Sequence, residues 1–71
     1  MKISGNNIGE MLKEAREQKK LTQEQLAQKV GKKRAYITRI ESEQGNKINL
    51  QTLREIVEKG LDGELNIDLD L

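Results

Sequence analysis

The sequence predicts an all-α domain of four to five short helices with a short β-strand at its C-terminal end. Apolar residues recur at helical spacing in successive stretches between residues 8 and 60, and the last eight residues alternate between polar and apolar. The 71-residue length allows one small domain, whose core must consist of Leu, Ile, Val and Ala because Phe and Trp are absent. We expect residues 1–60 to form the helical domain and residues 61–71 a tail of that domain.

The first helix is predicted from residue 8 to about residues 18–20. Asn7 is a suitable N-cap, and an apolar face follows at helical spacing, formed by Ile8, Met11, Leu12 and Ala15. Arg16 lies at the edge of this face. Its guanidinium either holds a carboxylate of another helix in a bidentate pair or is solvated.

Residues 22–41 contain two short helical patterns joined by a tight turn. Thr22 and Gln25 have the spacing of a capping box, in which each side chain accepts a hydrogen bond from the other residue's backbone N–H. Gly31 ends the first pattern, since glycine adopts the left-handed conformation of a sharp turn at little cost. The second helix spans about residues 33–42. Its inner face is predicted to hold Ile37, Ile40 and Glu41, and its outer face Arg34, Ala35, Thr38 and Arg39.

A polar loop and one more helix follow. Gly45 and Asn46 are typical of a turn, and Asn46 and Lys47 either reach a phosphate or are merely solvated. Asn49 is the predicted N-cap of the last helix and Gly60 its predicted C-cap. The apolar face of this helix is predicted to consist of Leu50, Leu53, Ile56 and Val57.

Charge is distributed unevenly along the chain. The first 47 residues carry 11 Lys/Arg and 6 Asp/Glu, whereas the remainder carries 2 and 6. Residues 32–39 hold four cations and no anion. Such a run is often only a solvated surface, but on the outer face of one helix it favours a polyanionic partner.

The composition argues against catalysis. His and Cys are absent, which removes the usual metal ligands and the Ser-His and Cys-His nucleophile pairs. The glycines form no phosphate-cradling motif. We therefore expect no enzymatic activity, catalytic residue, metal or cofactor. No signal peptide or membrane span is expected, and the lack of cysteine fits a cytoplasmic location.

The two-helix stretch resembles the helix-turn-helix of the phage-repressor/Cro (XRE-like) family. The resemblance covers about residues 8–59 and is closest in the run YITRIE, residues 36–41. Matching positions are Gln23, Leu26, Ala27, Val30, Gly31, Ile37 and Ile40. Lys32 and Lys33 depart from the family pattern, which usually has an apolar residue and a Ser or Thr there. Both substitutions add positive charge where the second helix begins.

The resemblance implies a sequence-specific regulator of transcription that places helix 33–42 in the major groove of double-stranded DNA. The expected target is a near-palindromic operator that a homodimer reads. Base contacts are expected from Arg34, Ala35, Thr38 and Arg39, and phosphate contacts from Lys32 and Lys33. Further expected DNA-binding residues are Thr22, Gln23, Tyr36 and Lys47. The resemblance also implies a structural ion pair between Arg16 and Glu41. An RNA target is disfavoured because Tyr36 is the only aromatic residue.

The alternating residues 64–71 predict a strand with apolar positions at Leu65, Ile67, Leu69 and Leu71. No other segment predicts a strand, so this one must pair with a second copy, pair with another protein, lie on the helices or remain disordered. The ending GLDGELNIDL resembles that of HigA-type helix-turn-helix antitoxins. The alternative function is therefore an antitoxin that captures a toxin protein and regulates its own operon.

Overall fold

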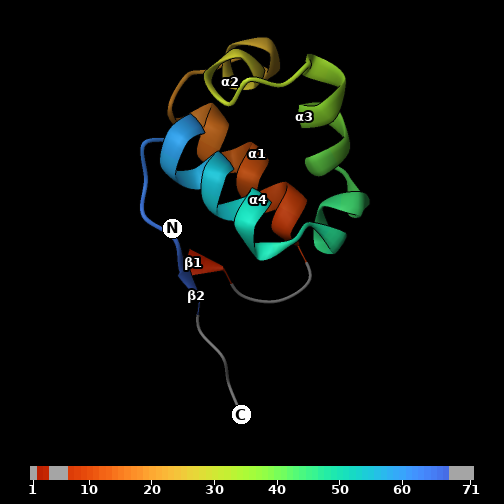
Figure 1. The fold of residues 1–71 in the computed structure, drawn as a ribbon, viewed down its shortest axis with the longest axis vertical. Helices are drawn as coiled ribbons and strands as arrows, with labels where there is room; N and C mark the ends of the chain where they lie inside the picture. Colours follow the sequence, from red (N-terminus) through yellow and green to blue (C-terminus); the bar gives the residue numbers. More distant parts are fainter. Residues whose placement is uncertain (1, 4–6, 68–71) are drawn as a thin grey trace.

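Four α-helices surround one apolar core (Figure 1). The computed structural model describes residues 2–3 and 7–67. Its elements are β1 (Lys2–Ile3), α1 (Ile8–Gln18), α2 (Gln23–Lys29), α3 (Arg34–Ile40), the 3-10 helix η1 (Glu43–Lys47), α4 (Leu50–Glu55), the π-helix η2 (Ile56–Gly60) and β2 (Asn66–Ile67). The four α-helices and η2 contribute to the core, which consists of Leu12, Leu26, Ala27, Ile37, Ile40, Leu53, Ile56, Val57 and Leu61.

The α2–α3 corner forms as the sequence predicts. Thr22 Oγ1 accepts from the Gln25 N–H at 3.0 Å, and Gln25 Oε1 accepts from the Thr22 N–H at 2.8 Å. Gly31 is left-handed, with φ of 69°. Ala27 is 1% exposed, so a small side chain lies inside the corner. The capping box, the glycine turn and the small residue together fix where α3 begins relative to α2.

The N-terminus of α1 is capped differently from the prediction. Asn7 occupies the N-cap position but forms no side-chain cap bond. Instead, Asn46 Oδ1 in η1 accepts from the Ile8 N–H at 3.0 Å. The side-chain oxygen of Asn46 is therefore used inside the fold, and the phosphate contact considered for this exposed residue stays a prediction. A cap supplied from 38 positions away depends on tertiary structure and leaves no local sequence signal.

Two glycines allow η1 to lie directly against α1. A Cβ atom on Gly9 would overlap the Ser42 carbonyl oxygen, and one on Gly45 would overlap the Ile40 carbonyl oxygen. Each glycine is needed because a backbone passes where its side chain would be. The sequence pattern predicts only a turn at Gly45 and indicates no role for Gly9.

The last helical segment differs from the prediction at both ends. Asn49 Oδ1 caps α4 by accepting from the Thr52 N–H at 2.8 Å, as expected. Leu50, predicted to be in the core, is 51% exposed because it precedes the part of the helix that faces the core. Gly60 is not a C-cap: it is the last residue of η2 and is buried, and the left-handed residue is Asp62, with φ of 53°.

The C-terminal segment pairs within the chain. β2 is parallel to β1, with Lys2 opposite Asn66 and Ile3 opposite Ile67. Both strands lie at the end of the molecule opposite α2 (Figure 1). The expectation that no second strand exists in the chain was therefore wrong, because two residues are too few to give a periodic signal. Of the other predicted strand residues, Leu65 is half-buried against the core and precedes β2, whereas Leu69 and Leu71 lie outside the described residues.

An ion pair anchors the start of this segment to α2. Lys29 Nζ lies 2.9 Å from Asp62 Oδ2, and this hydrogen bond lowers the pKa of the Asp62 carboxyl below its usual value. Asp62 is therefore paired with Lys29 in the fold. None of the helices in the described ranges is both long and apolar enough to cross a bilayer.

Candidate nucleic-acid interface

Helix α3 has one buried and one exposed face. Ile37 and Ile40 are 0% and 5% exposed and hold the helix to the core. The opposite face consists of the exposed residues Arg34, Ala35, Thr38 and Arg39. This is the division that the sequence predicts, and it leaves two guanidinium groups, one hydroxyl and one methyl group exposed. The α3 helix lies at the edge of the bundle (Figure 1).

A buried ion pair holds the C-terminal end of α3 against α1. Arg16 Nε donates to Glu41 Oε2 at 2.7 Å, and Arg16 Nη2 donates to Glu41 Oε1 at 3.1 Å. The two side chains are 10% and 3% exposed. Hydrogen bonding to Glu41 raises the pKa of Arg16 above its ordinary value, although burial opposes this shift. The predicted pair is therefore present in the structure and is bidentate, which fixes direction as well as distance.

Arg16 also makes a contact that the sequence analysis missed. Its Nη1 donates to the backbone carbonyl of Leu21 at 2.7 Å. Leu21 lies in the short connection between α1 and α2, so one guanidinium joins three parts of the domain. The carbonyl partner is invisible in sequence because any residue at position 21 would supply it.

Gln23 connects the ion pair to the exposed face of α3. Its Nε2 donates to Glu41 Oε1 at 3.1 Å. Its Oε1 accepts from Thr38 Oγ1 at 3.0 Å and from Arg34 Nε at 3.5 Å. The sequence predicts only a DNA contact for Gln23, whereas in the structure its half-buried side chain extends from α2 to bond with Glu41 and with Thr38 of α3. Gln23 therefore orients two residues of the exposed face.

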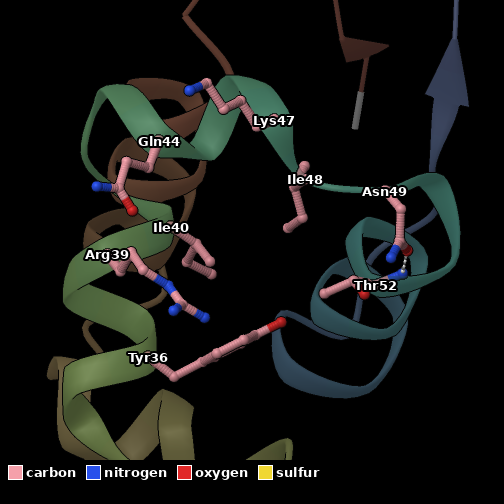
Figure 2. Close-up of a pocket in the computed structure, with 8 residues that line it drawn as sticks. All are labelled: Tyr36, Arg39, Ile40, Gln44, Lys47, Ile48, Asn49 and Thr52. Atoms are coloured by element: carbon pink, nitrogen blue, oxygen red, sulfur yellow. Dashed lines mark hydrogen bonds between the residues drawn. The ribbon is translucent and has the colours of Figure 1, made fainter.

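A second cationic cluster borders α3 on the side of α4. The half-buried Tyr36 ring has Lys32 Nζ 5.5 Å and Arg39 Cζ 5.6 Å from its centroid. Figure 2 shows the ring extending from α3 toward α4, with its hydroxyl at the α4 side. It lines a groove of about 490 Å³ to which η1 contributes Lys47. The groove thus brings together positive charge from α3, at Arg39, and from η1, at Lys47, while Lys32 lies near the Tyr36 ring without lining the groove.

The remaining predicted DNA-binding residues are also accessible. Lys33 occupies the N-cap position of α3 without a side-chain cap bond, and it is exposed together with Thr22, Lys32 and Lys47. In the described ranges, no three acidic side chains lie close enough to hold a metal ion. The predicted DNA-binding residues thus lie on α3 and on the neighbouring segments: the start of α2, the turn before α3, and η1.

Comparison with known proteins assigns the family. A family model described as helix-turn-helix matches residues 12–59, which run from α1 into η2 and cover more than half of the chain. No curated protein and no solved structure matches the chain. The matched region contains the α2–α3 corner, the ion pair and the exposed face of α3. The chain belongs to the Cro-type (XRE-like) helix-turn-helix family, a family of DNA-binding regulatory domains.

Proposed function

We propose that the protein is a sequence-specific regulator of transcription that inserts α3 into the major groove of double-stranded DNA. The observation that carries the proposal is the exposed, cationic face of α3. The buried Arg16–Glu41 ion pair and the turn at Gly31 position this helix on the rest of the domain. A seven-residue helix fits the major groove, where its N-terminal residues reach base edges.

The proposed DNA contacts fall into two groups, those to base edges and those to phosphates. Arg34 and Arg39 suit bidentate binding to guanine, and Ala35 suits the thymine methyl group. Lys32 and Lys33 precede the helix and suit phosphates, which position the protein without specifying sequence. Phosphate contacts are also proposed for Thr22, Gln23, Tyr36 and Lys47. Gln23 gives one amide N–H to Glu41 and has a second for DNA.

Arg34→Ala should lower affinity for the preferred site by about 1–3 kcal/mol and relax the preference at one base pair. Lys33→Ala should weaken binding to all duplexes alike and reduce the salt slope by about one charge. The measurement is a fluorescence titration of parent and variants against a selected and a mixed-sequence duplex at several salt concentrations. A parent chain that binds neither duplex at low salt would refute the proposed function.

We further propose that two copies associate and place their α3 helices roughly 34 Å apart, matching half-sites one helical turn apart in a near-palindrome. Residues 61–71 are the proposed contact region. The supporting observation is that β1 and β2 are the two strands of one small sheet, so each has a single partner in the described chain. An unpaired sheet edge can accept a further strand, either from a second copy or from another protein.

Capture of another protein corresponds to the second candidate function, a HigA-type antitoxin. Truncation after Leu65 distinguishes the two roles and retains both Leu61 in the core and Leu65 against it. If the segment pairs with itself, the truncated chain should sediment as a monomer at concentrations where the parent is dimeric. A truncated chain that remains dimeric would contradict self-pairing, and its loss of binding to a toxin encoded beside it would favour the antitoxin role.

A further inference from the structure

The hydroxyl group of Thr38 donates its single proton to an acceptor inside the protein. Thr38 Oγ1 lies 3.0 Å from Gln23 Oε1 and 3.2 Å from the backbone carbonyl oxygen of Arg34. Both of these oxygens accept hydrogen bonds and neither can donate one. A threonine hydroxyl has one proton and two lone pairs. Whichever acceptor takes the proton, Thr38 offers only lone pairs to a molecule outside.

The orientation of the Gln23 amide determines that Thr38 donates its proton inward. The Arg16–Glu41 ion pair in turn determines the orientation of this amide. Glu41 is a carboxylate bonded to Arg16 and can only accept, so Gln23 must turn its NH2 group toward it. The Gln23 carbonyl oxygen consequently faces Thr38. The opposite orientation would put the amide oxygen against the carboxylate and the NH2 group against Arg34, and both contacts would be repulsive.

We infer that Thr38 is a specificity-determining residue that accepts a hydrogen bond from the exocyclic amine of adenine or cytosine and does not donate to a keto oxygen. This inference rests on the proposed function. In the major groove, adenine N6 and cytosine N4 are donors, whereas thymine O4 and guanine O6 are acceptors. A freely rotating threonine hydroxyl would pair with either group. The contacts with Gln23 and Arg34 remove one of the two options.

Every base pair contains one amine base and one keto base, so a consensus sequence alone does not test the inference. The first step is selection of binding sites from a randomised duplex library with the full chain and with Thr38→Val, which replaces the hydroxyl by a methyl group of similar size. Thr38 is exposed, so the fold should survive, and circular dichroism checks this. The base pair whose preference disappears in Thr38→Val is the one that Thr38 contacts.

The second step removes single groups at that base pair. Purine in place of adenine, or pyrimidin-2-one in place of cytosine, deletes the amine. 2-Aminopurine in place of guanine, or 5-methylpyrimidin-2-one in place of thymine, deletes the keto oxygen. Loss of the amine should weaken binding of the parent by about 2- to 10-fold more than binding of Thr38→Val. Loss of the keto oxygen should affect both proteins equally. Thr38→Ser retains the hydroxyl and should behave as the parent.

The inference and the proposed function fail in different ways. A parent chain that selects a site but is more sensitive to loss of the keto oxygen than Thr38→Val would overturn the inference alone. The same holds if Thr38→Val changes the preference at no base pair. A parent chain that selects no site would overturn the proposed function, and the inference with it.

Discussion

Arg16→Met should lower the free energy of unfolding by about 3–5 kcal/mol, because it leaves the Glu41 carboxylate buried without its cation. Glu41 is 3% exposed as a side chain and would retain only the Gln23 amide as a donor. The loss is large relative to the roughly 4–10 kcal/mol expected for a domain of this length. Urea unfolding followed by circular dichroism measures it.

Two controls distinguish the stability loss caused by the unpaired, buried Glu41 carboxylate from any general effect of losing an arginine. Arg54→Met removes an exposed cation from α4 and should change stability by less than about 0.5 kcal/mol. Arg16→Met combined with Glu41→Met leaves no buried charge, so the double variant should be more stable than Arg16→Met alone. If Arg16→Met and Arg54→Met had equal midpoints, the ion pair would not hold α3 in place.

Gly9→Ala is the second change with a large expected effect on stability. The structure predicts a loss of stability, whereas helix propensity alone predicts a gain. Alanine is favoured over glycine in a helix by about 1 kcal/mol, so propensity alone predicts stabilisation. In the structure, the added Cβ would overlap the Ser42 carbonyl oxygen, and 2.8 Å separates its position from the Glu41 backbone carbon. Displacing this backbone, which joins α3 to η1, should destabilise the protein by about 1–3 kcal/mol. Thermal and urea unfolding measure both sign and size.

Gly63→Ala is the matched control. A Cβ atom at Gly63 would have its nearest neighbour at 3.5 Å, an ordinary contact, and should leave stability within about 0.5 kcal/mol of the parent or raise it slightly. Gly9→Ala shifts the Ile8 N–H as well, so the bond to Asn46 should weaken and amide exchange at Ile8 should accelerate. A more stable Gly9→Ala chain would show that η1 does not pack tightly on α1.

The sequence predicted the parts of the fold that depend on neighbours along the chain. The Thr22 capping box, the Gly31 turn and the Asn49 cap require only residues within one helical turn of each other. The two faces of α3 follow from helical periodicity in the same way. The Arg16–Glu41 pair is not local, and it was expected because the family resemblance connects two residues 25 positions apart.

The features that sequence reasoning missed all arise between segments that are distant in the chain. Asn46 caps α1 only because Gly9 and Gly45 allow η1 to approach. β1 has only two residues, too few for a periodic pattern, and finds its partner at the other end of the chain. The direction of the Thr38 hydrogen bond depends on the orientation of the Gln23 amide, and that orientation depends on Glu41. None of these relations follows from spacing, because each needs the packed structure to bring the atoms together.

The π-helical winding of η2 allows the length of this chain to vary by one residue at this point. The Leu61 N–H bonds to the Ile56 carbonyl oxygen at 3.0 Å, five residues back, so the last turn holds one residue more than an α-helical turn. Deleting one exposed residue of this turn, such as Glu58, would permit regular winding, with the Leu61 N–H bonded four residues back and Leu61 still directed toward the core. A deletion in a regular α-helical turn instead rotates the residues that follow it by about 100°. A change of one residue is thus compatible with η2 and with the exposed connection at residues 62–64, and incompatible with the regular turns of α1 to α4.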